Sequence, residues 1–138
     1  MNIRIAEKNE NEKVLKHYQE CNYGAGINKD DLVIIAIDKE IVGAVRICVE
    51  QNIRVLRGMQ VKKPFQRNGI GSLMLKYLEE NLDLKDCYCL PYKHLREFYA
   101  QVGFEEVLPR YAPRFLAERL ENYLSGGYGE IIIMKVSK

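Results

Sequence analysis

The sequence predicts an α+β (mixed α/β) fold in a single domain, and three observations lead to this prediction. First, residues 1–138, the whole chain, have the length of one ordinary domain. Second, short apolar runs typical of strands are interspersed with segments whose apolar residues recur at helical spacing. Third, the expected order of strands and helices, βαβββαβαβ(α)β, favours layers of both kinds within one domain.

The first part of the chain is expected to form a strand, a helix and three further strands. Apolar and polar residues alternate over residues 3–5, and Val14, Leu15 and Tyr18 then lie on one face of a helix. Two glycines mark a loop over residues 22–26. The next three strands are separated by short polar turns and predict an antiparallel meander over residues 32–37, 41–49 and 53–61.

The second part of the chain begins with a change from strand to helix periodicity. After Gly69, apolar residues recur at intervals of three and four, which predicts an amphipathic helix with a stripe of Ile70, Leu73, Met74, Tyr77 and Leu78. A strand over residues 86–90 precedes a second helix, which ends at Gly103. The remaining segments predict a strand, a helix and a strand over residues 104–108, 113–124 and 131–136.

Composition and charge exclude several classes of protein. Hydrophobic residues make up 47% and charged residues 29%, which is typical of a globular domain and not of a disordered or fibrous chain. A net charge of +2 gives no electrostatic case for nucleic acid or a membrane surface, so neither is expected as a partner. No apolar run approaches the roughly 20 residues of a membrane span. The N-terminus lacks the features of a secretory signal, so we expect a cytoplasmic protein.

The cysteines and histidines give no case for a metal site. Cys87 and Cys89 are the only close pair of cysteines, and the two histidines, His17 and His94, are far apart in the sequence. We therefore expect no metal. Cys87 and Cys89, like Cys48, fall on predicted strands, which favours buried core thiols over reactive ones.

Residues 59–72 are the segment most informative about chemistry, because a strand, a polar loop and two glycines there lead into a helix. Helix N-termini expose unpaired N–H groups, and glycines allow a phosphate to approach them closely. The segment lacks the Gly-Lys-Ser/Thr of a Walker loop, and Met74 stands where a dinucleotide fingerprint needs its third glycine. On these residues alone, a pyrophosphate site and a simple tight turn into a core helix both remain open.

Two motifs in this chain resemble those of the GCN5-related N-acetyltransferase (GNAT) superfamily. Gln66-x-x-Gly69-x-Gly71 is similar to the family's Q/R-x-x-G-x-G/A signature between a strand and a helix. The segment over residues 98–104, Phe-Tyr-Ala-Gln-Val-Gly-Phe, resembles the family's F/L-Y-x-x-x-G-F segment. The resemblance covers residues 32–107 and implies a twisted, mostly antiparallel sheet with helices on both faces. It also implies an acetyl-CoA-dependent N-acetyltransferase acting on a small-molecule or protein amine.

The resemblance also implies which residues bind acetyl-CoA. The backbones of Met59 and Val61 would contact the pantetheine arm, although both side chains also fit a plain core. The backbone amides of residues 67–72 would hold the pyrophosphate, with side-chain contacts from Gln66 and Arg67. Tyr92 stands where many relatives carry an asparagine that contacts CoA or the acceptor. The implied cofactor-binding set is Met59, Val61, Gln66, Arg67, Asn68, Gly69, Ile70, Gly71, Ser72 and Tyr92.

Tyr99 aligns with the family's usual general acid, which protonates the leaving CoA thiolate. A core tyrosine on an apolar helical stripe is the alternative. The general base is open, because residues 53–57 carry no carboxylate where some relatives have a glutamate. Glu50 and Glu105 are the candidates, and either could instead be a solvated surface charge. His94 is a weaker candidate.

Residues 108–129 are longer than the connection that the resemblance leads us to expect between the last strands. This insertion could wall the acceptor site, form the contact of a homodimer, or serve only as structural cover. The missing carboxylate also keeps a second function open, namely a non-catalytic acyl-CoA-binding regulatory module.

Overall fold

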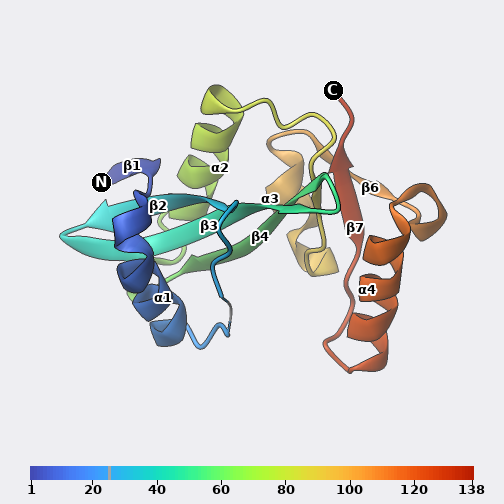
Figure 1. The fold of residues 1–138 in the computed structure, drawn as a ribbon, viewed down its shortest axis with the longest axis horizontal. Coiled ribbons are helices and arrows are strands. Elements are labelled where there is room, and N and C mark those ends of the chain that lie inside the picture. Colours follow the sequence, from blue (N-terminus) through green and yellow to red (C-terminus); the bar gives the residue numbers. More distant parts are fainter. Residues whose placement is uncertain (25) are drawn as a thin grey trace. The chain divides into compact units, whose positions relative to one another are not determined.

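The structure is a computed structural model that describes residues 1–24 and 26–138 (Figure 1). Ala25, within the loop expected over residues 22–26, lies outside the described residues. The chain divides into two compact units, residues 1–83 and residues 84–138, and each is described by itself.

The first unit contains four strands in the spatial order β1-β2-β3-β4, each antiparallel to the next. They are β1 (Asn2–Ile5), β2 (Leu32–Asp38), β3 (Glu40–Glu50) and β4 (Ile53–Val61). Gln51 and Asn52 join β3 to β4 with φ of 51° and 65°, the left-handed pair typical of a two-residue hairpin. The predicted antiparallel meander is therefore confirmed.

One helix covers each face of this sheet. The helix α1 (Asn11–Glu20) lies in front of the strands in Figure 1 and joins a core cluster of Val14, Tyr18, Val33, Ile35, Ile41 and Ala44. Ala36 points to the opposite face from Ile35, because successive strand residues alternate. There it lies beside Gly43, and the side chain of Met74 from α2 (Ile70–Asn81) packs against Gly43.

The buried faces of the two helices differ in detail from the predicted ones. In α1, His17 is buried and Leu15 is only half-buried. In α2, Leu73 is 47% exposed while Leu75 is fully buried. At 100° per residue, the buried arc of α2 is rotated by about 60° from the predicted stripe. Periodicity identified the helix, but the angle at which α2 meets the sheet decided which side chains are covered.

The second unit contains the strands β5 (Tyr88–Cys89), β6 (Phe104–Val107) and β7 (Ile133–Val136). Their order is β5-β7-β6, and both pairings are antiparallel. Two helices accompany them, α3 (Arg96–Ala100) and α4 (Arg114–Ser125). Gly103, which follows α3, has a φ of 95°, so a glycine stands where the backbone is left-handed.

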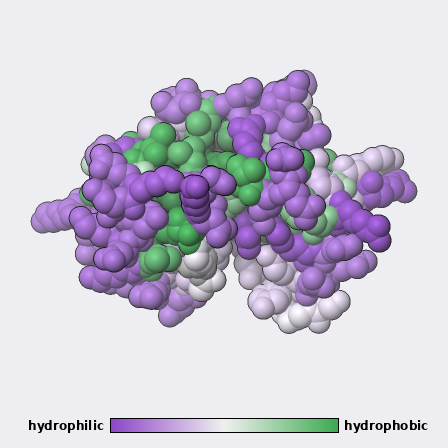
Figure 2. All heavy atoms as spheres, in the orientation of Figure 1, coloured by the Kyte–Doolittle hydropathy of each residue, from purple (hydrophilic) through white to green (hydrophobic). Residues whose placement is uncertain are grey.

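The predicted strand over residues 86–90 is shorter in the structure, because Asp86 has a left-handed φ of 66° and Pro91 follows closely. Short 3₁₀ helices lie at Lys8–Glu10, Lys63–Phe65, Lys93–Leu95 and Pro109–Tyr111. Most atoms on the face drawn in Figure 2 belong to hydrophilic residues. Among the described residues, no helix is both long and apolar enough to cross a membrane.

Candidate functional site

The start of α2 presents backbone N–H groups that no side chain caps. Gly69 is the N-cap with a left-handed φ of 78°, and its carbonyl accepts the first helical bond from the Leu73 N–H at 3.0 Å. The amides at residues 70–72 belong to the first turn, so they have no acceptor within the helix. Arg67, with a φ of 66°, and Asn68 are exposed in the preceding loop. These residues and the positive end of the helix dipole together have the features of an anion-binding site, in one continuous stretch of chain.

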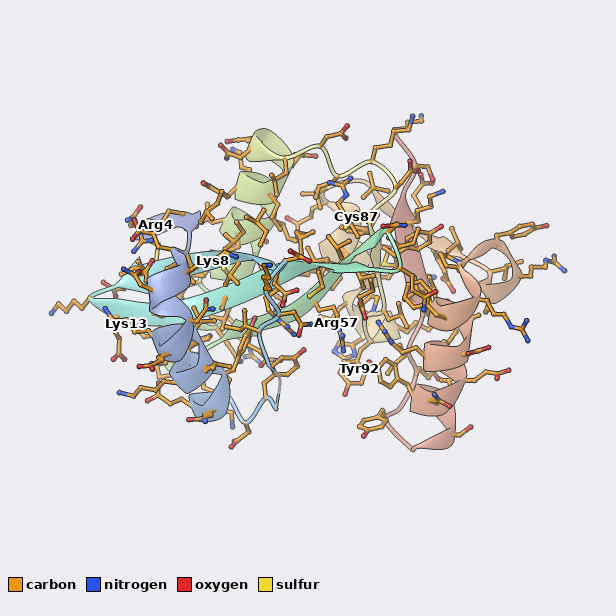
Figure 3. All side chains as sticks on the ribbon, in the orientation of Figure 1. Arg4, Lys8, Lys13, Arg57, Cys87 and Tyr92 are labelled. Atoms are coloured by element: carbon orange, nitrogen blue, oxygen red, sulfur yellow. The ribbon has the colours of Figure 1, made fainter. Side chains whose placement is uncertain are left out.

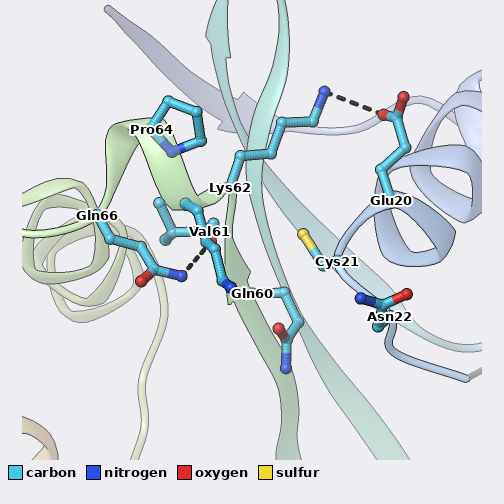
Figure 4. A pocket seen from close by; sticks show the side chains of 9 residues that line it. Glu20, Cys21, Asn22, Gln60, Val61, Lys62, Pro64 and Gln66 are labelled. Atoms are coloured by element: carbon cyan, nitrogen blue, oxygen red, sulfur yellow. Dashed lines mark hydrogen bonds and ion pairs between the residues drawn. The ribbon is translucent and has the colours of Figure 1, made fainter.

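Gln66 ties this loop to the end of β4. Its side-chain amide donates to the Val61 carbonyl at 2.8 Å (Figure 4). The Lys62 N–H donates to the Val42 carbonyl at 2.9 Å, so Lys62 and Val42 form a hydrogen-bonded pair between β4 and β3. Because such pairs alternate, the N–H and C=O of Val61 point away from β3. The structure thus brings Val61, Gln66 and the α2 N-terminus together within the first unit.

A cavity of about 340 Å³ adjoins the same strand end (Figure 4). Its lining residues are Glu20, Cys21, Asn22, Gln60, Val61, Lys62, Lys63, Pro64 and Gln66. Lys62 lies between two carboxylates, 3.0 Å from Glu20 and 2.9 Å from Glu40. Burial opposes the ammonium charge, but the two carboxylates outweigh it and raise the pKa of Lys62. The lysine therefore stays charged where β3, β4 and α1 meet.

Met59 lies beside an irregularity that the sequence did not reveal. The pairing of β3 with β4 shifts register between Ala44 and Arg46, and Gly58 opposite them has a φ of 68°. A Cβ at Gly58 would lie 2.8 Å from the Tyr18 hydroxyl and 3.2 Å from Arg46 Nε. Only glycine fits this bulge, which immediately precedes the proposed pantetheine-binding residues.

Arg46 is only 3% exposed and is a further residue that sequence reasoning missed. Its guanidinium donates to the Gly26 carbonyl at 2.7 Å and pairs with Asp31 at 3.3 Å. Among the described residues, Arg46 Nε and the Tyr18 hydroxyl have no hydrogen-bond partner, although both are buried. An arginine in the middle of the apolar run over residues 41–49 was the available signal.

His17 is buried beside the same strand. Its Nε2 donates to the Gln60 carbonyl at 2.9 Å, and burial lowers the pKa of the imidazole. The neutral ring is therefore favoured, and the buried His17 links α1 to β4 through this hydrogen bond. Burial likewise raises the pKa of Cys48 to about 12 and raises that of Cys89, so both thiols stay protonated.

The two candidate bases occupy different surroundings. Glu50 lies 3.6 Å from Arg57 Nη1, at the turn end of the β3–β4 hairpin. Val61 is eight residues along β4 from Ile53, which pairs with Glu50, so the loop end is about 26 Å away along the strand. Glu105 is exposed on β6 and pairs with Lys135 in register.

Tyr99 is 6% exposed on α3 within the second unit. Its ring meets Phe98 and Phe104 edge to face, at centroid distances of 4.9 Å and 6.1 Å. Tyr92 is 43% exposed and stacks on His94 at 5.6 Å, on the segment that leads into α3 (Figure 3). Among the described residues, no group of three or more His, Cys, Asp or Glu side chains is arranged to hold a metal.

Comparison with known families gives one match over most of this region. The family described as "Acetyltransferase (GNAT) domain" matches residues 28–106, which is more than half of the chain. The matched segment contains β2, β3, β4, α2 and the Phe98–Phe104 motif. None of the curated proteins compared with the chain matches it.

Solved structures of similar fold cover nearly the whole chain. The ribosomal-protein-S18-alanine N-acetyltransferase from Escherichia coli has a TM-score of 0.68 at 16% identity, and the match covers 99% of this chain and 94% of that enzyme's chain. An aminoglycoside 6'-N-acetyltransferase solved with coenzyme A has a TM-score of 0.65 at 17% identity, covering 97% and 95%. A GNAT-family acetyltransferase from Staphylococcus aureus has a TM-score of 0.63 at 18% identity, covering 99% of both chains. These likenesses confirm the predicted fold.

Proposed function

This chain belongs to the GNAT acetyltransferase family, and we propose that it transfers the acetyl group of acetyl-CoA to a primary amine. In this proposal residues 1–138 act as one N-acetyltransferase domain, and transfer is direct, within a ternary complex. The observation that carries the proposal is the uncapped N-terminus of α2, which follows a left-handed glycine and a strand end with outward-facing backbone groups.

The pyrophosphate of acetyl-CoA would be held by the amides of residues 67–72. The exposed Arg67 adds a positive side chain at this point, and Gln66 holds the loop against β4. Because the amides are fixed by the chain itself, they bind an anion without first having to be ordered. Met59 and Val61 would bind the pantetheine arm through their backbones, and Tyr92 would contact CoA or the acceptor.

In the proposed reaction, a neutral amine attacks the thioester carbonyl and a C–N bond forms. The C–S bond then breaks, the amine nitrogen loses its proton to a base, and the leaving thiolate gains a proton from the Tyr99 hydroxyl. Glu50 and Glu105 are the carboxylates proposed for the base, directly or through water. The protonated state of the Cys48 and Cys89 thiols supports direct transfer over an acyl-cysteine intermediate.

A second candidate function is a binding module that holds acyl-CoA without turnover. The observation that favours it is the stretch over residues 53–57 on β4, which carries two arginines and no carboxylate.

The acceptor in the first proposal, the acetyltransferase, is a small-molecule or protein amine. The similar structures include enzymes named for an aminoglycoside and for a protein alanine.

Replacing Tyr99 by phenylalanine separates the two functions. If Tyr99 is the general acid, Tyr99→Phe lowers kcat by about 100- to 10,000-fold, while calorimetry shows an unchanged Kd for acetyl-CoA. The matched control is Tyr88→Phe, because Tyr88 is also 6% exposed in the same unit. An unchanged kcat would remove Tyr99 from the mechanism. Acetyl-CoA binding without turnover of any amine in the wild type would establish the binding module instead.

A further inference from the structure

An open cavity of about 500 Å³ lies within the second unit. Its lining residues are Tyr92, Lys93, His94, Tyr128, Gly129 and Glu130. The two segments that form it are held together by the backbone, because the Lys93 N–H donates to the Glu130 carbonyl at 3.0 Å and Tyr92 bridges to Ile131. The backbones of the two segments that line the cavity are therefore held together within this unit.

Two tyrosine rings in this cavity are accessible to solvent. Tyr92 is 43% exposed and Tyr128 is 60% exposed. Each ring is supported by another ring: Tyr92 stacks on His94 at 5.6 Å, and Tyr128 meets Tyr123 edge to face at 5.7 Å. Supported rings keep their orientation while part of their surface faces solvent, which suits them to bind a ligand at low entropic cost.

The cavity contains one carboxylate and one ammonium group, which are paired with each other. The side chain of Glu130 is 81% exposed, and the Lys93 ammonium lies 3.8 Å from its carboxylate. The side chain of Lys93, itself an alkylammonium group, thus already lies in this cavity. The side chain of Lys93 is 53% exposed on a flexible stem, so a ligand cation would compete with its ammonium group for the Glu130 carboxylate. The negative faces of the tyrosine rings add cation–π attraction.

A short helical segment connects the cavity to Tyr99. The segment Lys93–Leu95 is a 3₁₀ helix that continues directly into α3, which carries Tyr99. Tyr99 lies seven positions after Tyr92, and a helix rises about 10–14 Å over seven positions. An extended aliphatic chain with an amino group at each end spans such a distance.

We propose that the Tyr92–Tyr128 cavity binds an organic ammonium group, and that the acceptor is a diamine or polyamine. This assignment of the acceptor class rests on the proposed acetyltransferase function. The reacting nitrogen must be neutral to attack the thioester, so the cation held in the cavity is the second nitrogen of the same acceptor. Tyr128 and Glu130 then determine specificity without contacting the reacting atoms.

The binding part of the proposal is tested without turnover. Choline and its uncharged carbon analogue are titrated into the full chain, and shifts of the tyrosine ring signals are followed by NMR. We expect choline to bind about 3- to 30-fold more tightly than the uncharged analogue, the range of cation–π contacts. Tyr128→Leu and Glu130→Gln should each weaken choline binding. Tyr111→Leu is the matched control, because Tyr111 is 69% exposed in the same unit and does not line the cavity.

The acceptor part is tested by turnover. The kcat/KM for hexanediamine should exceed that for hexylamine by about 3- to 30-fold. Tyr128→Leu should bring this ratio close to one, whereas the control Tyr111→Leu should keep it. Equal binding of choline and its analogue, or no binding of either, overturns the cavity assignment. Choline binding with no preference for the diamine overturns the acceptor assignment alone. Turnover of neither amine, with choline still bound, counts against the proposed function rather than against the cation site.

Discussion

At the scale of single residues, two arginines beside the β4 bulge each need a carboxylate partner. Arg46 and Arg57 stand directly opposite each other on β3 and β4, a pairing that repels unless it is compensated. Asp31 compensates the first arginine at 3.3 Å and Glu50 the second at 3.6 Å. Glu50 therefore already has a structural role, in addition to the role proposed for it as a base.

Replacing Gly58 by alanine should destabilise the protein. The alanine would have to adopt a left-handed φ of 68°, and its Cβ would lie 2.8 Å from the hydroxyl of the fully buried Tyr18. We expect a loss of about 2–4 kcal/mol in the free energy of unfolding, measured by urea denaturation. The double variant Gly58→Ala/Tyr18→Phe should recover part of this loss, since it removes the clashing oxygen. Additive effects of the two substitutions would contradict the proposed steric contact.

The ion pair of Arg4 with Glu10 should make stability depend on pH. Hydrogen bonds from Arg4, at 2.7 and 2.8 Å, and from the Glu7 N–H lower the pKa of Glu10 from 4.5 to about 2. A lowered pKa in the folded state stabilises the protein above pH 4.5, and this contribution is lost as the pH falls toward about 2. Urea denaturation across this range should show a smaller loss for Glu10→Gln than for the wild type.

The control for this pH dependence is Glu80→Gln. Glu80 pairs with Lys76 on the exposed face of α2 at 3.8 Å, and its side chain is 58% exposed. Exposed pairs of this kind contribute little to stability. The pH dependence of Glu80→Gln should therefore match that of the wild type, and a flattened profile would show that the effect is not specific to Glu10.

At the scale of elements, the junction of β4, the loop and α2 concentrates the proposed acetyl-CoA contacts. Gln66 connects the loop to Val61, and Gly69 turns the chain so that the first amides of α2 face outward without a cap. A strand that ends beside a helix start is a compact way to place one backbone edge and one set of amides within reach of a single long ligand.

Gly69→Ala tests the proposed role of this junction. No atom lies within 4 Å of the site of the new Cβ, so the cost is the strain of a left-handed φ of 78°, about 1–2 kcal/mol. Gly127→Ala is the matched control, because Gly127 also has open space and a φ of 77°. Both variants should lose similar stability, and only Gly69→Ala should weaken acetyl-CoA binding in calorimetry. Equal Kd values for the two variants would argue against the loop as the phosphate site.

At the scale of the whole molecule, the residues assigned to the phosphates lie in the first unit and Tyr99 lies in the second. If residues 1–138 act as one domain, a ligand that binds the folded chain must raise its overall stability. Acetyl-CoA at a hundred times its Kd should add about 2.7 kcal/mol to the free energy of unfolding.

Thermal unfolding with acetyl-CoA, with ATP and NAD as controls, measures this effect. We expect the midpoint to rise with acetyl-CoA alone, since the loop has neither a Walker lysine nor a third fingerprint glycine. A rise with ATP or NAD of the same size would indicate a general anion site. The absence of any shift at millimolar acetyl-CoA would mean that the loop over residues 66–72 does not bind CoA.

The elements and the family followed from the sequence alone, because both depend on residues that are close together in the chain. Apolar spacing predicted the meander and α2, and Gly103 predicted the end of the helix that carries Tyr99. Two short motifs, each within seven residues, were enough to indicate an acetyltransferase.

Only the tertiary structure decided which residues meet across long separations in the sequence. Tyr18, Arg46 and Gly58 come from three different elements, and nothing in their local spacing places them together. The cavity between Tyr92 and Tyr128 depends in the same way on a pairing across more than thirty residues. Local periodicity specifies a helix or strand, whereas the rotation and register with which elements pack specify which side chains are buried together and which remain available for a ligand.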